Sequence, residues 1–397
     1  MNRDALYAKL KTVPLLRQWN ARLKSAKLRR DLILLRERYE RLARESGTVY
    51  SEATALELMR SRRRGMTRWS PPDSGLRILW VGANWHQDSS GFLAGLAKFG
   101  EVVQFHNAAG TYGLRQRWDG EDVARNDRAL REQFRAMRDA GPVHLVLGQM
   151  WAQLVSSGAL QEIRTQGAMT ANISMDDRLP EHWSTASGVR SGSVGLGPGL
   201  DMVLTSSPET PEWFLAEGVP AVYMPMASDP ERFRPFPEDQ KRYDVTFVGS
   251  KYGLREKLVN ALVAGGIHVD PFGPGWPNGS VDANQSAEIF GRSRIILGMG
   301  TVAHSEDLFT IKLRDFDGPM CGAMYITHRN PDLLQLYRES EEIACYRTAD
   351  ECVHKVRYYL SHPEHRRRVA AAGMARARAD HTWQARLSHV FGLMGLS

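Results

Sequence analysis

Short apolar runs alternate with helical segments along most of this chain, and the whole alternation occurs twice. The first series runs from LRILWVG (residues 76–82) to PAVYMPM (residues 220–226). The second runs from YDVTFVGS (residues 243–250) to EEIACY (residues 341–346). Strands that are apolar throughout and separated by helices belong to parallel sheets covered on both faces. The sequence therefore predicts an α/β protein, with its sites beyond the carboxyl ends of the strands.

The segment ASDPERFRPFPED (residues 227–239) separates the two series, because it carries three prolines and no apolar period. A chain of 397 residues also exceeds one ordinary core. We expect two doubly wound, Rossmann-like domains facing a cleft, with an N-terminal helical extension. The predicted parts are a helical arm (1–70), an N-terminal domain (76–226), a linker (227–240) and a C-terminal domain (241–397) whose last helix crosses back to the first domain.

The arm carries the positive charge of the chain. Residues 1–70 hold 18 Lys and Arg against 7 Asp and Glu, whereas the whole chain has a net charge of only +7, so the remainder is mildly acidic. Charge thus gives no reason to expect nucleic acid as a partner of the main body. Apolar residues of the arm follow steps of four and three, as in a coiled-coil seam: Leu28, Leu32, Leu35, Tyr39 and Leu42. A helix packing on its own domain, a dimerising helix and a basic helix contacting anionic lipid remain open.

The cysteine content and the N-terminal sequence predict in which cellular compartment the protein resides. The three cysteines form no CxxC pair, so neither a disulfide framework nor structural zinc is expected. The N-terminus shows no apolar signal segment, and no run is long enough to span a bilayer. We expect a cytoplasmic protein, with peripheral contact at the inner membrane face left open through the arm.

The densest charge cluster opens the segment KLRDFDGPMCGAMYIT (residues 312–327). If a helix begins there, Asp315 or Asp317 would cap it or interact with its dipole. A cap does not account for Lys312 and Arg314, because cations are unfavourable at a helix N-terminus unless an anion shares the site. The cluster therefore favours a nucleotide-diphosphate site, in which a carboxylate accepts hydrogen bonds from ribose hydroxyls.

Other candidates directly follow predicted strands. Gly249 and Ser250 end the first strand of the second series and open a helix, where backbone N–H groups and Arg255 can approach an oxyanion. The chain has no GxGxxG or GxxxxGK[ST] motif, which argues against a dinucleotide oxidoreductase and a P-loop NTPase.

In the first series, His86 follows the first strand and the adjacent acids Asp176 and Asp177 follow another. Neighbouring side chains project differently, so one of these acids is expected to face the cleft as a general base or as a sugar contact. Capping the next helix is an equally good explanation of the pair.

Two further features are expected beside the cleft. The glycine-rich run SGSVGLGPG (residues 191–199) is interpreted as a mobile loop beside it. Trp85, Trp183 and Trp276 fall in predicted cleft loops, where an indole can stack on a sugar or a base.

The second half resembles the catalytic half of GT-B glycosyltransferases of the "glycosyl transferases group 1" type, and within them the CgeB-like group. The resemblance follows the order of DVTFVGS, DPFGPGWP, RSRIILGM, KLRDFDGPMCGAMYIT, NPDLLQLY and the stretch from YYLSHPEH to HTWQAR, over residues 244–386. In the first half it rests only on the strand–helix rhythm and on SMDDRLPEHW (residues 174–183).

This resemblance implies roles for several residues. Asp317 takes the place of a ribose-binding Glu, and Lys312 and Arg314 lie near the diphosphate. Gly249 and Ser250 form the phosphate-side turn, and residues 273–276, with Gly273 and Trp276, lie near the nucleotide base. Related retaining enzymes carry a second Glu eight positions before Asp317. Phe309 stands there in this chain, with Glu306 or Asp307 as the substitute.

The implied activity is transfer of a sugar, as by a hexosyltransferase, from a nucleotide-diphosphate sugar to an acceptor hydroxyl of a glycan, a lipid-linked molecule or a protein. The co-substrate is the nucleotide sugar, and neither a cofactor nor a metal is expected. Two alternatives stay open: a nucleotide-sugar epimerase on the same fold, and a non-catalytic CgeB-like assembly protein.

Overall fold

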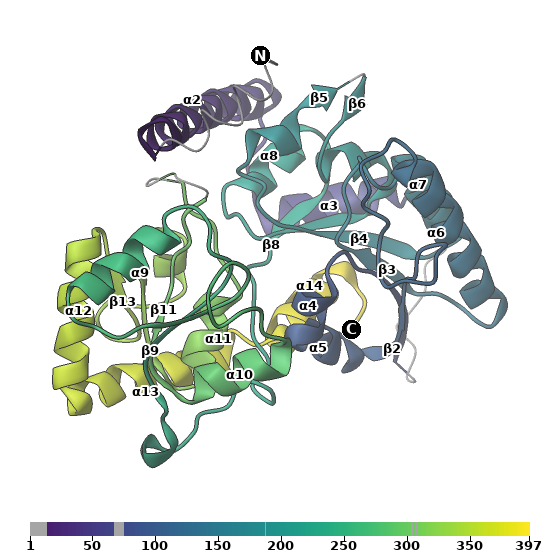
Figure 1. The fold of residues 1–397 in the computed structure, drawn as a ribbon. Coiled ribbons are helices and arrows are strands. Elements are labelled where there is room, and N and C mark those ends of the chain that lie inside the picture. The colour runs from purple at the N-terminus through teal and green to yellow at the C-terminus, as the bar shows by residue number, and fades with distance from the viewer. Residues whose placement is uncertain (1–13, 67–74, 187, 303–304, 306–307) are drawn as a thin grey trace.

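The computed structural model describes residues 14–66, 75–186, 188–302, 305 and 308–397. Two parallel sheets, each covered by helices on both faces, form two lobes, and a long N-terminal helix lies outside them (Figure 1). No helix among the described residues is long and apolar enough to cross a membrane.

The first sheet is parallel throughout. Its order is β2 (Gly100–Gln104), β1 (Leu76–Val81), β3 (Leu145–Gly148), β4 (Met169–Ser174), β7 (Met202–Thr205) and β8 (Ala221–Tyr223). Successive side chains of a strand point to opposite faces. In β1, Ile78 and Trp80 enter one apolar cluster and Leu79 and Val81 another, so the strand is buried on both sides.

Helices cover both faces of this sheet: α4 (Trp85–Gln87), α5 (Leu93–Ala97), α6 (Asp122–Asp139), α7 (Ser157–Thr165) and α8 (Thr210–Ala216). The sequence of α6 explains its packing, because Leu130, Phe134 and Met137 are spaced by four and three and are all buried. The N-terminus of α7 is fixed by Ser156, whose hydroxyl accepts the N–H of Ala159 at 3.1 Å. A short hairpin, β5 (Thr185–Ala186) and β6 (Val189–Arg190), projects from the same domain.

The second sheet is also parallel, in the order β10 (Asp270–Phe272), β9 (Tyr243–Val248), β11 (Ser293–Leu297), β12 (Met324–His328) and β13 (Ala344–Tyr346). Its helices are α9 (Arg255–Ala264), α10 (Ala283–Gly291), α11 (Arg314–Met320), α12 (Ala349–Ser361) and α13 (Pro363–Asp380).

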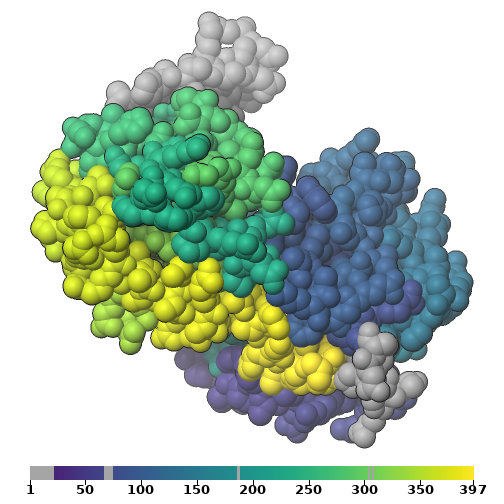
Figure 2. Space-filling model, turned by 90° about the horizontal axis from the view of Figure 1, so that it is seen from below, coloured from purple at the N-terminus to yellow at the C-terminus, as the bar shows by residue number. Residues whose placement is uncertain are grey.

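The chain passes between the domains twice, and the two passages touch. Ser228, after β8, accepts the N–H of Trp383 at 3.1 Å and donates its own N–H to the carbonyl of His381 at 3.0 Å. The last helix, α14 (Trp383–Met394), then packs on the first domain, where Trp383 meets Phe92 and Phe391 meets Phe99. Figure 2 shows these C-terminal helices in yellow crossing from one lobe to the other.

The arm forms α2 (Pro14–Ser46) and α3 (Glu52–Arg62). The predicted seam of α2 packs within its own chain: Tyr39 is fully buried and stacks on Trp213 of α8 at 5.2 Å between ring centroids. Leu32 and Leu35 are buried in the same cluster. This seam is therefore not available for a coiled coil with a second copy. Contact of other surfaces of the arm with lipid or with another copy stays a prediction.

The glycine-rich run is not a mobile loop. Residues Val194–Gly199 form a buried 3-10 helix against α7. Its glycines permit close packing, because a Cβ on Gly195 would lie 2.0 Å from the carbonyl oxygen of Arg190 and one on Gly199 would lie 2.4 Å from that of Ser157. The interpretation was wrong because glycine serves close approach here and not mobility.

Candidate functional site

A cleft of about 450 Å³ lies between the domains, at the carboxyl ends of both sheets. Its walls come from the segments after β1, β4 and β9 and from the start of α11. It brings together eight of the residues singled out from the sequence: His86, Asp176, Gly249, Ser250, Arg255, Lys312, Arg314 and Asp317.

Gly249 lies where two guanidinium groups meet. Its φ of +151° lies in a region that side-chain-bearing residues rarely adopt. A Cβ at this position would lie 2.7 Å from Nη1 of Arg314 and 3.4 Å from Nη1 of Arg255. Glycine is therefore required for this approach of the backbone to the two arginines.

Each of these arginines is held by backbone carbonyls. Arg314 donates to the carbonyls of Val248 and Met299, and it lies over the ring of Phe247 at 4.8 Å from the centroid. Arg255 donates to the carbonyl of Ser250 at 2.9 Å. In the part of the chain that the structure describes, neither guanidinium makes an ion pair.

The two guanidinium groups therefore lack an ion-pair partner in the described part of the chain, while the buried Asp315 and Asp317 attract Arg314 without forming an ion pair with it. Burial, followed by repulsion from Arg314, lowers the pKa of Arg255 to about 10. In the described part of the chain, the buried Nε of Arg314 has no hydrogen-bond partner. An anion bound here would relieve both the repulsion and the missing hydrogen bond, so the turn is suited to a phosphate or a diphosphate.

Lys312 contributes a third cation and reaches across the cleft. Its Nζ lies 3.3 Å from Oδ1 of Asp176, in an ion pair between the two domains. Both side chains are about one-third exposed, at 31% and 39%, so a ligand can displace one partner. Asp176 has a φ of +59°, which is uncommon for a residue with a side chain.

The carboxylates at α11 have different surroundings. Asp315 is buried and accepts the N–H of Lys312 at 2.7 Å and the hydroxyl of Tyr325, so it stabilises the start of the helix. Asp317 lies deeper in the cleft wall, where the hydroxyl of Ser228 donates to it at 2.7 Å. Burial raises the pKa of Asp317 well above its usual range. Asp315 therefore stabilises the first turn of α11, although the N-cap, Leu313, makes no side-chain capping hydrogen bond, and Asp317 is the α11 acid that lines the cleft.

Of the two adjacent acids one faces the cleft, as expected, and it is Asp176; the candidate Asp177 does not line the cleft. It is buried and accepts hydrogen bonds from Ser174 at 2.5 Å and Thr205 at 2.6 Å. Burial raises its pKa to about 7. After β4 ends at Ser174, the left-handed backbone at Asp176 turns the chain, and Asp176 faces the cleft whereas Asp177 faces the core. His86, on α4, is exposed at the cleft wall.

Gly273 and Trp276 lie behind the Gly249 turn and do not line the cleft. The indole N–H of Trp276 donates to the carbonyl of Gly249 at 2.9 Å. A Cβ on Gly273 would lie 2.5 Å from that same carbonyl oxygen. Both residues therefore support the turn. Trp183 is buried in the first-domain core, and Trp85 is 49% exposed.

Glu306 and Asp307 lie outside the described residues. Phe309 packs its ring against His328 at 4.8 Å between centroids. Its carbonyl accepts a hydrogen bond from Arg178 at 3.2 Å.

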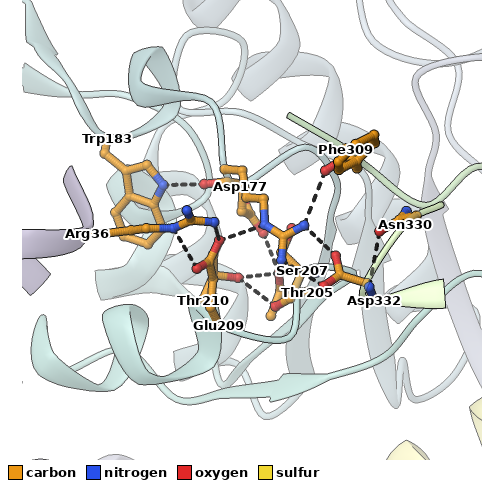
Figure 3. A network of polar contacts seen from close by, with 11 residues as sticks. Arg36, Asp177, Trp183, Thr205, Ser207, Glu209, Thr210, Phe309, Asn330 and Asp332 are labelled. Atoms are coloured by element: carbon orange, nitrogen blue, oxygen red, sulfur yellow. Dashed lines mark hydrogen bonds and ion pairs between the residues drawn. The ribbon is translucent and has the colours of Figure 1, made fainter. Parts of the chain in front are cut away.

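Arg178 is the centre of an ionic network that sequence reasoning missed (Figure 3). Its guanidinium binds both oxygens of Asp332 in the second domain and donates to Glu209 of the first at 2.6 Å. Glu209 in turn accepts from Arg36 of α2 at 2.9 Å and 3.0 Å. The network therefore joins the arm and both domains. The chain gave no local signal for it, because its four charged residues are far apart in sequence.

Comparisons with known proteins agree with this architecture. Residues 254–392 match a family model described as glycosyl transferase-like. A comparison of the sequence with curated proteins finds no match.

Three solved structures show the fold. Sucrose-phosphate synthase from Thermosynechococcus elongatus has a TM-score of 0.55 and 12% identity, with 80% of this chain and 98% of that chain covered. HepE from Anabaena, in complex with UDP and glucose, has a TM-score of 0.58 and 11% identity, with 80% of this chain and 99% of that chain covered. A glycosyltransferase from Rickettsia africae has a TM-score of 0.58 and 10% identity, with 82% of this chain and 100% of that chain covered. The fold is that of GT-B glycosyltransferases, as the sequence predicted.

Proposed function

We propose that this protein transfers a sugar from a nucleotide-diphosphate sugar to an acceptor hydroxyl. The second domain would bind the donor, the first would bind the acceptor, and the cleft would hold the reacting atoms. The observation that carries the proposal is the pair Arg255 and Arg314, whose charges meet at the Gly249 turn without a carboxylate partner among the described residues. The glycosyl transferase-like match over residues 254–392 supports the same assignment.

The chemistry follows from where charge develops. When the bond between the anomeric carbon and the diphosphate breaks, the electron pair leaves with the nucleoside diphosphate. Fixed cations stabilise that growing negative charge without reorganisation. Arg255 and Arg314 are held by carbonyls and are suited to this role, and Lys312 lies beside them on the cleft side. Asp317 would accept a hydrogen bond from the ribose.

Asp176 and His86 face the cleft from the first domain. As the acceptor oxygen bonds to the anomeric carbon, its proton must move to a base. We assign this role to Asp176, whose carboxylate lies 3.3 Å from Lys312 and is thus next to the donor phosphates. His86 would contact the sugar or the acceptor. A hexosyl donor and activity without a metal or cofactor remain predictions. In the described residues no group of three or more His, Cys, Asp and Glu is placed to hold a metal ion.

The test is a thermal-shift screen against UDP, GDP, ADP, CDP, dTDP and their sugars, with a chelator present. We expect stabilisation selective for one base, because a ligand that binds the folded state raises the melting temperature. Lys312→Ala removes one charge-assisted contact and should weaken binding of that nucleotide by roughly tenfold.

Lys257→Ala is the matched control. Lys257 is exposed on α9, two residues after Arg255, and does not line the cleft. It should leave nucleotide binding unchanged. If no nucleotide stabilises the folded protein, the proposal fails and the non-catalytic assembly protein becomes the better reading. If the donor sugar is converted to its epimer without an acceptor, the epimerase is correct.

A further inference from the structure

A second hollow of about 440 Å³ opens beside the cleft on the side of the first domain. The two share Asn84, Gln87, Met175 and Asp176, so they adjoin each other. Asp176 lies at their junction. A molecule in the second hollow would therefore reach the carboxylate that faces Lys312 across the cleft.

The lining of this hollow is rich in uncharged hydrogen-bonding groups. Five carboxamides border it: Asn84, Gln87, Gln116, Gln149 and Gln153. Two indoles, from Trp118 and Trp151, border it as well. Its ionisable members are Asp176, Glu181 and His182, and neither Lys nor Arg lines it in the described part of the chain.

Trp118 is the most informative residue of the hollow. Its side chain is 64% exposed although an indole loses much by contact with water. Its φ of +57° is rare for a bulky residue. Such an arrangement persists only when the surroundings enforce it, and it is frequent at ligand contacts.

The surroundings of Trp118 do enforce it. The buried carboxylate of Asp122 accepts the N–H of Trp118 at 2.6 Å and that of Arg117 at 3.2 Å, and it pairs with the guanidinium of Arg115. The Gln116 amide donates to the carbonyl of Ala83 at 3.0 Å, which ties the loop to the end of β1. The indole is therefore presented at the hollow by a fixed backbone.

We propose that this hollow binds a neutral sugar residue of a glycan, which is the acceptor. One face of a sugar ring is apolar and stacks on an indole, and its hydroxyls both donate and accept, as carboxamides do. A lipid phosphate would require cations, and a lipid tail would require apolar walls. This inference rests on the proposed function, since it names the acceptor of that reaction.

The transfer step balances with these groups. A glycan hydroxyl oxygen bonds to the anomeric carbon of the donor, the bond from that carbon to the diphosphate breaks, and the hydroxyl proton passes to Asp176.

The test uses the full-length protein on an array of neutral and acidic oligosaccharides, with Ser/Thr peptides and phosphatidylglycerol vesicles measured beside it. We expect retention on one or more neutral glycans, and Trp118→Ala should weaken it roughly tenfold or more. Trp118→Phe should restore part of it. Trp85→Ala is the matched control, because Trp85 is 49% exposed nearby but lines neither hollow.

Each possible result of this test either supports or overturns the inference. Absence of glycan retention, equal retention by Trp118→Ala, or preference for peptide or vesicles overturns the inference. Nucleotide-dependent melting is measured on the same variants and should not change in Trp118→Ala. If glycan binding depends on Trp118 but no nucleotide binds, the proposed transfer fails while the carbohydrate site stands.

Discussion

Replacing Asp332 by Ala should destabilise the protein through the Arg178 network. The two side chains are only 9% and 8% exposed, and the carboxylate accepts two N–H groups of the guanidinium. Removing one partner of a buried pair costs about 3–5 kcal/mol, because the other charge is left without compensation. Burial alone would lower the pKa of Arg178, but Asp332 and Glu209 raise it above its usual value.

Glu209 stays in place in this variant and still pairs with Arg178 at 2.6 Å. We therefore expect the lower end of that range, about 3 kcal/mol in the free energy of unfolding. The assay is urea unfolding followed by tryptophan fluorescence, with ΔΔG taken from the shift of the midpoint at constant slope.

A double-mutant cycle tests the cause of this loss. The cycle compares Arg178→Met, Asp332→Ala and the variant that carries both. The double variant lacks both charges and should lose less stability than the sum of the two single changes. A cost of Asp332→Ala below about 1 kcal/mol, in the range of exposed pairs, would refute the reasoning. So would strict additivity in the cycle.

Three further predictions concern the cleft and the buried acid beside it. Gly249→Ala should lose the nucleotide-dependent melting shift, because its Cβ would lie 2.7 Å from Arg314, whereas Gly279→Ala, also at positive φ but with open space around it, should retain the shift. Asp177→Asn should flatten the fall in stability between about pH 4 and pH 7 in urea titrations; the pKa of Asp177 is raised to about 7, so its stabilising contribution is complete below its unfolded pKa and is lost as pH rises to 7. Asp176→Asn should tighten nucleoside diphosphate binding several-fold in calorimetry while abolishing transfer, because Asp176 competes with phosphate for Lys312; unchanged affinity would contradict this.

The sequence was informative where short, mostly apolar runs alternate with helical segments. The runs 76–81 and 243–248 are parallel strands at the positions expected. The same rule places residues directly after strands at one edge of the sheet, which is why Gly249 and Asp176 meet in the cleft. Lys312 and Arg314 could be predicted as residues of the cleft, because cations are unfavourable at a helix N-terminus unless an anion binds there.

Other features depend on contacts that sequence order does not reveal. Which of Asp176 and Asp177 faces the cleft follows from the local backbone, including the φ of +59° at Asp176. Trp276 is close to the site in space, yet its indole N–H donates a hydrogen bond to the carbonyl of Gly249 and its ring does not line the cleft. Trp118 was not singled out, because nothing in its neighbours predicts that Asp122 fixes its backbone.

The paired passages at Ser228 and Trp383 restrict how the domains can move. Two chain crossings fastened to each other leave rotation about a common axis as the soft motion, since translation would stretch both. Ser228 also donates to Asp317, at 2.7 Å. Asp317 is thus hydrogen-bonded to the junction between the domains, so we expect its position to stay nearly constant while Asp176, on the other domain, moves as the cleft opens.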